Sequence, residues 1–94
     1  MEDIFLGNKR ILILQNIERN ITLSNEMLQR ALRAYGHSIS VEEVNRHLIW
    51  LKERGLLNID ELSASVWTAE LTRHGKEVAK GIVRESGIDD PVED

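Results

Sequence analysis

The sequence predicts one mainly α-helical domain with a small β-hairpin, in the order helix, helix, helix, strand, strand, helix. Three observations carry this prediction. The chain has 94 residues, which is enough for one domain with a single hydrophobic core. Apolar residues recur at helical spacing up to about residue 54 and alternate with polar residues after Gly55. Residues typical of helix caps stand at the expected helix boundaries.

The first helix is expected over residues 3–19, which contain no proline. Its apolar side chains form three stripes: Leu6/Ile13/Ile17, Ile4/Ile11/Leu14 and Phe5/Leu12. A helix that is apolar nearly all round is buried on more than one face. We therefore expect a homodimer contact here, with Ile4, Phe5, Ile11, Leu12 and Leu14 as the candidate interface. The alternative is that the other helices of the same chain cover these faces.

The second and third helices are predicted from their caps. Ser24 is expected to cap the second helix, which ends at Gly36. Ser40 and Glu43 have the spacing of a capping box for the third helix, and Ile39 and Val44 the spacing of a hydrophobic staple. Gly55 ends the third helix after Arg54. The short connection between the two helices predicts a sharp turn, as in a helix-turn-helix.

A hairpin and a fourth helix complete the expected domain over residues 1–84. Alternation at Leu57 and Ile59, and again from Val66 to Leu71, predicts two strands joined by a short loop. Thr72 is expected to cap the last helix, with Val78, Ala79, Ile82 and Val83 on its apolar side. Residues 85–94 hold five acidic residues and no basic one, which predicts a flexible acidic tail.

Composition excludes several classes of function. The chain has no cysteine, so thiol catalysis, disulfides and cysteine-based zinc sites are excluded. The longest apolar runs, Ile11–Leu14 and Leu48–Leu51, are too short for a membrane span, and the N-terminus lacks the basic region of a secretory signal. We therefore expect a cytoplasmic protein with no membrane contact.

Two sequence blocks resemble small winged helix-turn-helix regulators of the ArsR and MarR type. Residues 44–57, VNRHLIWLKERGLL, resemble their third helix and first wing strand, and residues 71–79, LTRHGKEVA, resemble the segment that leaves the wing. A wider resemblance, carried by NEMLQ at 25–29 and by further positions from Ala31 to Pro91, is to the small winged-helix proteins of Mu-like bacteriophages and prophages. The resemblance implies a winged helix-turn-helix fold and a phage origin.

The winged-helix resemblance implies a DNA-reading face on the third helix. In this fold that helix enters the major groove and basic residues elsewhere hold the phosphates. Its outward residues are Glu42, Glu43, Asn45, Arg46 and Ile49. Asparagine and arginine can pair with adenine and guanine, whereas Glu42 and Glu43 oppose DNA. The candidate DNA-binding set is Arg30, Arg33, Asn45, Arg46, Ile49 and Lys52, with Arg54 as a further basic residue near the motif.

The predicted wing weakens the case for tight DNA binding. Residues 57–71 contain no lysine or arginine but include Asp60, Glu61 and Glu70. Residues 1–84 hold twelve basic and eleven acidic residues, so the domain is nearly neutral. With few charges to neutralise phosphates, DNA affinity should be modest and should fall with salt.

The remaining candidates for chemistry predict no catalytic or cofactor site. The histidines His37, His47 and His74 are spaced unlike any local zinc motif, so surface or capping roles are expected. No glycine-rich phosphate loop or nucleophile motif is present. Trp50 and Trp67 are expected to anchor the core or, alternatively, to mark a partner surface. The chain is therefore expected to be no enzyme and to need no metal or cofactor.

Three functional hypotheses follow from these patterns. The first is a homodimeric DNA-binding protein of a phage or prophage, with a role in transcription or on phage DNA. The second is an adapter that binds a phage or host protein in assembly or packaging, through the third helix and the acidic wing, with Trp50 and Glu61 as test positions. In the third, the acidic tail folds back over the DNA-binding face.

Overall fold

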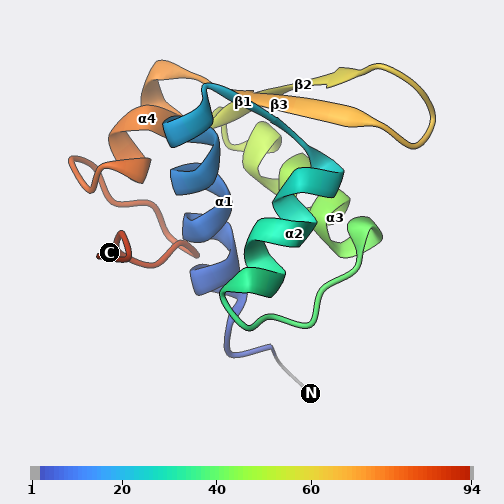
Figure 1. The fold of residues 1–94 in the computed structure, drawn as a ribbon. Coiled ribbons are helices and arrows are strands. Elements are labelled where there is room, and N and C mark those ends of the chain that lie inside the picture. Colours follow the sequence, from blue (N-terminus) through green and yellow to red (C-terminus); the bar gives the residue numbers. More distant parts are fainter. Residues whose placement is uncertain (1–2, 94) are drawn as a thin grey trace.

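The structure, a computed structural model, describes residues 3–93 and has the architecture of a winged helix. Four helices and a three-stranded antiparallel sheet follow one another along the chain. Their bounds are α1 Leu6–Asn20, β1 Thr22–Ser24, α2 Asn25–Ala34, α3 Val41–Glu53, β2 Leu57–Glu61, β3 Trp67–Leu71 and α4 Arg73–Ala79. The hairpin of β2 and β3, with its loop at residues 62–66, is the wing, and it extends beyond the helices in Figure 1. The predicted fold class is confirmed.

The expected caps of three helices are confirmed. The Ser24 hydroxyl accepts a hydrogen bond from the Met27 backbone N–H at 3.2 Å, and the Ser40 hydroxyl accepts one from the Glu43 backbone N–H at 3.1 Å. The Thr72 hydroxyl accepts from the Gly75 backbone N–H at 3.1 Å. Each cap satisfies a backbone donor that the first helical turn leaves unpaired, so these starts are encoded locally.

The core lies inside one chain and corrects part of the dimer prediction. Ile11, Leu12 and Leu14 are 0–1% exposed, because α2, β1, β3 and α4 pack around α1. In Figure 1, α1 runs between α4 on one side and α2 on the other. The expectation that these three residues contact a second copy is therefore wrong, and the single-chain alternative holds for them. Ile4 and Phe5, at 83% and 53% exposed, stay available to a partner.

The first helix starts later than expected. It begins at Leu6 rather than at residue 3, since the Asp3 carboxylate accepts a hydrogen bond from the Phe5 backbone N–H at 2.8 Å and forms a turn there. Ile4 and Phe5 therefore precede the helix.

The sheet contains a strand that sequence periodicity did not predict. β1 pairs with β3, giving the order β1-β3-β2, and Leu23 and Ile59 both lie opposite Ala69. Only three residues long, β1 is too short to show a period. Ile21, with a φ of 71°, makes the turn from α1 into this strand.

The C-terminal part corrects two expectations. α4 ends at Ala79, because Gly81 adopts a φ of +79° and turns the chain away, so Ile82 is 69% exposed instead of buried on a helix. Residues 85–93 do not form a free tail but pack against α1. The Gln15 side chain donates to the Val92 carbonyl at 3.0 Å and accepts from its N–H at 3.1 Å, and Ile88 and Val92 contact the core.

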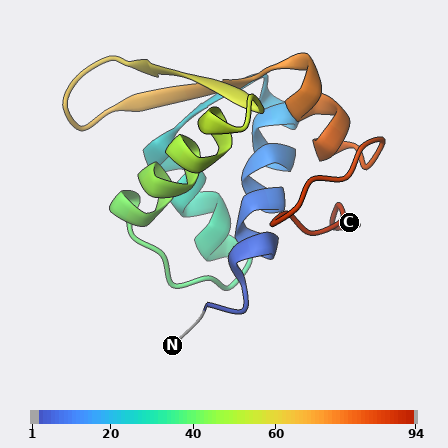
Figure 2. The same ribbon diagram turned by 180° about the vertical axis from the view of Figure 1, so that it is seen from behind.

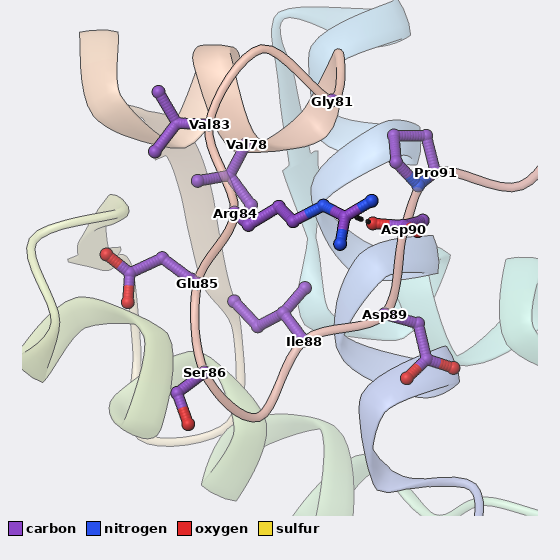
Figure 3. A pocket seen from close by; sticks show the side chains of 10 residues that line it. All are labelled: Val78, Gly81, Val83, Arg84, Glu85, Ser86, Ile88, Asp89, Asp90 and Pro91. Atoms are coloured by element: carbon purple, nitrogen blue, oxygen red, sulfur yellow. Dashed lines mark ion pairs between the residues drawn. The ribbon is translucent and has the colours of Figure 1, made fainter.

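The same segment encloses a surface hollow next to α4. The hollow has a volume of about 520 Å³ and is lined by residues of α4 and of the C-terminal segment, among them Val78, Ile88 and Pro91. Figure 3 shows Arg84 reaching across it toward Asp90, with which it forms an ion pair at 3.4 Å. The acidic composition predicted a flexible segment. Its apolar side chains, which lie between the acidic residues, instead pack on the core of the domain.

Candidate nucleic-acid interface

The exposed face of α3 lies beside the wing. Figure 2, the view from behind, shows α3 toward the viewer and the wing above it. Glu42, Arg46, Ile49, Lys52 and Glu53 are exposed along this helix, while Val44, Leu48 and Leu51 are buried beneath it. We call the exposed side chains of α3 together with the wing the helix–wing surface. Of the predicted DNA-binding residues, it brings together Arg46, Ile49 and Lys52.

A groove separates the C-terminal half of α3 from the wing. It has a volume of about 330 Å³ and is lined by Ile49, Lys52, Glu53, Ile59, Glu61 and Trp67. Its floor is apolar, and its rim carries two carboxylates and one ammonium group. Lys52 is therefore the one basic side chain among the lining residues.

Asn45 has a structural partner that the sequence did not reveal. The Asn25 side-chain amide donates to Asn45 Oδ1 at 2.9 Å and to the Ser65 carbonyl at 3.1 Å. Asn25 Oδ1 accepts from the backbone N–H groups of Glu26 and Trp67, at 3.0 and 3.2 Å. Asn25 is fully buried, and it ties α3 and the wing to the start of α2. Asn45 thus shares its carbonyl oxygen with this network.

The two basic residues predicted on α2 lie apart from this set. Arg30 and Arg33 are exposed on α2, not on the helix that carries Arg46 and Lys52. They can meet DNA only if the duplex also runs along α2.

Glu43 belongs to a half-buried charge network between α1 and α3 and not to the exposed face. The Lys9 ammonium lies 2.8 Å from an Asp3 carboxylate oxygen and 2.7 Å from a Glu43 oxygen, and His47 Nε2 lies 3.2 Å from the same Glu43 oxygen. Burial would raise the pKa of Glu43, but the hydrogen bonds from Lys9 and His47 hold that pKa below its ordinary value. The capping box is therefore half formed: the Ser40 cap is present, while the Glu43 carboxylate joins α3 to α1.

This network also sets the charge state of its other members. Burial would lower the pKa of Lys9, but its hydrogen bonds to Asp3 and Glu43 raise that pKa above the ordinary value. Burial lowers the pKa of His47, against the opposing effect of Glu43. Lys9 therefore pairs with both carboxylates, and its single positive charge offsets one of their two negative charges near α3.

A second cluster, missed by sequence reasoning, lies on the flank of α3 that faces α1. The guanidinium carbons of Arg10 and Arg54 lie 3.7 and 3.4 Å from the centroid of the Trp50 ring. Arg10 also donates to the Gly87 carbonyl at 3.0 Å, and Arg54 to the Trp50 carbonyl at 3.1 Å. Nothing in the sequence indicates that Arg10 lies beside α3, because it belongs to another helix and precedes a wholly apolar run.

The three histidines make local pairs. His37 Nε2 lies 2.7 Å from the Asn8 side-chain oxygen, and His74 Nε2 lies 2.8 Å from a Glu85 oxygen. Within residues 3–93, no group of three or more His, Cys, Asp or Glu side chains is arranged to hold a metal ion. Nor does any helix in that range have the length and apolar character needed to cross a membrane.

Comparison with known proteins identifies relatives in phage and bacterial genomes. The chain is 32% identical over 92 residues to the uncharacterised protein gp26 of Escherichia phage Mu, an alignment that covers 97% of this chain and 95% of gp26. It is 30% identical over 73 residues to an uncharacterised protein of Haemophilus influenzae, covering 77% and 72% of the two chains. No protein-family model matches the sequence.

Solved structures share the fold at low sequence identity. RosR of H. salinarum superposes with a TM-score of 0.67 at 20% identity, over 83% of this chain and 71% of RosR. A structure described as a complex structure of RosR gives a TM-score of 0.62 at 18% identity, over 78% and 64% of the two chains. These similarities show that the chain shares its fold with RosR.

Proposed function

The chain belongs to the family of the phage Mu protein gp26, and we propose that within this family it is a small winged-helix protein that binds DNA. The observation that carries the proposal is the helix–wing surface, where Arg46 and Lys52 flank Ile49 on the exposed face of α3. In winged helices this helix enters the major groove and the wing lies along the neighbouring backbone. An action on transcription or on phage DNA is the role we propose for it.

The roles of the α3 residues differ. Arg46 is exposed and extends from the middle of the helix, where a guanidinium can reach a guanine edge or a phosphate. Lys52, nearer the wing, suits a phosphate contact. Asn45 needs both amide atoms to pair with adenine, yet its oxygen accepts from Asn25. We assign Asn45 mainly to positioning α3 against the wing.

The charges of the surface favour modest affinity. The wing carries Asp60 and Glu61 and no basic residue, so few phosphates can be neutralised there. The salt dependence of binding grows with the number of phosphates that the protein neutralises, because binding releases the counterions of those phosphates. We expect binding in low salt that weakens steeply as salt is raised.

Fluorescence anisotropy of labelled duplex DNA, at about 50 and 200 mM salt, tests the proposal. Arg46→Ala should weaken binding without changing the unfolding midpoint, while Asn45→Ala should weaken it and also lower stability. Arg73→Ala, at an exposed position on α4, is the matched control and should leave affinity unchanged. Absence of binding by the unmodified protein at low salt would contradict the proposal.

A second candidate function is a protein adapter, favoured by the apolar groove between α3 and the wing. Ile49 is 42% exposed there, and Glu53 and Glu61 on the rim would attract a basic partner. A phage or host protein recovered by pull-down and no longer recovered with Ile49→Ser and Glu61→Lys, in a protein that fails to bind DNA, would support this function over the first. The Arg73→Ala variant serves as control here too.

A further inference from the structure

We propose that Arg10, Trp50 and Arg54 form a phosphate-binding site that extends the DNA contact from α3 toward α1. The inference rests on the proposed function and names an additional part of its interface. None of the DNA contacts expected on the face of α3 involves Arg10, which lies on α1. We call these three side chains the arginine–tryptophan stack.

The geometry places the Trp50 ring between the two guanidinium groups. Both guanidinium carbons lie within 3.7 Å of the ring centroid, at stacking distance. Two planar groups cannot both occupy that position on one face of the ring without overlapping. Arg10 and Arg54 therefore cover opposite faces of Trp50, and cation–π attraction holds each in place.

Neither positive charge of the stack forms an ion pair with a carboxylate of the described residues, although Asp3 lies near enough to Arg10 to attract it. Within residues 3–93, neither Arg10 nor Arg54 forms an ion pair, whereas neighbouring Lys9 pairs with two carboxylates. The Arg10 Nε is buried without a hydrogen-bond partner among those residues. Burial and, after it, the nearby Arg54 lower the pKa of Arg10 against the attraction of Asp3, which reflects the cost of burying one cation beside another. A bound anion would offset part of that cost.

The chemistry of the stack favours a phosphate over a nucleobase. With both faces of Trp50 covered, the ring offers no open face on which a base could stack. The guanidinium edges that point away from the ring retain N–H donors, and such donors match the oxygens of a phosphate. An anion bound at these edges would keep both stacking contacts intact.

The stack is continuous with the proposed DNA-binding face. Arg10 and Trp50 line one hollow of about 400 Å³ together with Arg46, which extends from the exposed face of α3. Asp3 and Glu43 line the same hollow, but the Lys9 ammonium lies between them. The Arg10 and Arg46 guanidinium groups and the Lys9 ammonium outnumber these two carboxylates, so a DNA strand that contacts Arg46 can continue toward Arg10 and Arg54.

The test is the salt dependence of duplex binding by the full chain. Arg10→Gln and Arg54→Gln should each reduce the slope of log affinity against log salt by about one, the change expected when one phosphate is no longer neutralised. At about 50 mM salt each should bind several-fold more weakly. Arg10→Lys keeps the charge and should restore most of the slope. Arg84→Gln, at an exposed arginine beside the C-terminal hollow, is the matched control.

The possible outcomes separate this inference from the proposed function. If the unmodified protein binds DNA and both glutamine variants keep its slope and affinity, the stack is structural only and the inference is wrong. If the unmodified protein binds no duplex even at low salt, both the proposed function and this inference are wrong. Thermal unfolding of each variant shows whether weaker binding comes from loss of the fold. If Arg10→Gln does not fold, the Arg54→Gln variant decides the result, because Arg54 is exposed.

Discussion

Asn25 is fully buried at the start of α2, and its side-chain amide joins three parts of the molecule. It donates to Asn45 on α3 and to the Ser65 carbonyl in the wing loop, and it accepts from the backbone of β3. The cost of burying a polar group is offset only when its hydrogen bonds are made, and here the amide oxygen and nitrogen both have partners. This side chain therefore helps to fix the position of the wing relative to α3.

Asn25→Ala should destabilise the protein by about 2–4 kcal/mol, because it removes several hydrogen bonds of a fully buried amide and leaves the half-buried Trp67 backbone N–H without its acceptor. Urea unfolding measures the change. Asn58→Ala, an exposed asparagine on β2, is the control and should stay within about 0.5 kcal/mol of the unmodified protein. Equal effects for the two variants would show that the Asn25 network contributes nothing.

His47 should make stability depend on pH below neutrality. Burial holds its pKa below the ordinary value of 6.5 in the folded protein, against the attraction of Glu43 and with the repulsion of Arg10 and Lys9. Between the folded and unfolded pKa values the unfolded chain binds more protons, so stability rises with pH there. This contribution is complete above pH 6.5 and is lost as pH falls through 6.5 toward the folded pKa.

Urea unfolding between pH 7.5 and pH 5 tests the role of His47. The unmodified protein should lose stability on acidification, and His47→Gln should lose less over the same range. The comparison isolates His47, since His37 and His74 are present in both proteins. Identical pH profiles would mean that His47 protonates equally well in the folded and unfolded states.

At the residue scale, sequence analysis found candidates by type but could not assign their partners. Arg46 and Ile49 were predicted to share the exposed face of the third helix because of their spacing along it, and Lys52 was predicted as a basic residue near the motif. The ties of Asn45 to Asn25 and of Glu43 to Lys9 span 20 and 34 residues. Hydrophobic periodicity indicates only which side of a helix or strand a residue occupies. It therefore could not predict contacts between elements that are this far apart in the sequence.

Gly75 controls how closely α4 approaches the corner between α3 and β2. A side-chain carbon at Gly75 would collide with the backbone carbonyl of Leu56, and the Thr72 N–H donates to the same carbonyl at 3.1 Å. In an ordinary helix, Gly→Ala stabilises by up to about 1 kcal/mol. Here we expect the opposite sign.

Gly75→Ala should destabilise the fold by about 1–3 kcal/mol, the usual cost of overpacking against a backbone that cannot move freely. Chemical denaturation gives the sign directly. Lys76→Ala, an exposed position on the same helix, is the control and should be nearly neutral. Stabilisation by Gly75→Ala would show that α4 can shift away from Leu56 without cost.

At the element scale, the sequence predicted the features that local signals determine but missed those that depend on packing between distant segments. Ser24, Ser40 and Thr72 located three helix starts, because caps act within one turn. β1 exists only because β3 pairs with it. The C-terminal segment is ordered by contacts with Gln15 and Gly7, far away in sequence, while its acidic composition predicted a free tail.

Masking of the DNA-binding face by this segment stays a prediction, under which truncation after Arg84 should raise DNA affinity.

At the scale of the whole molecule, the burial of α1 narrows the expected dimer contact to the N-terminal end. Ile4, Phe5 and Tyr35 are 83%, 53% and 42% exposed and line one surface hollow of about 490 Å³ with His37. The Phe5 ring meets the His37 ring edge-on at 5.8 Å between centroids. Adjacent exposed apolar side chains of this kind are typical of protein contacts, and a homodimer through this end stays our prediction.

Sedimentation equilibrium over a range of concentrations tests the dimer. The unmodified protein should show a concentration-dependent shift toward twice the monomer mass, and Ile4→Ser with Phe5→Ser should move the equilibrium toward monomer. Since Ile4 is mostly exposed in the single chain, the effect should fall on association and leave the folded monomer intact. Leu62→Ser, at an equally apolar position on the wing that is 62% exposed, should leave the equilibrium unchanged. A dimer disrupted by Leu62→Ser and not by the N-terminal pair would place the contact on the wing, while monomer at every concentration would contradict the dimer altogether.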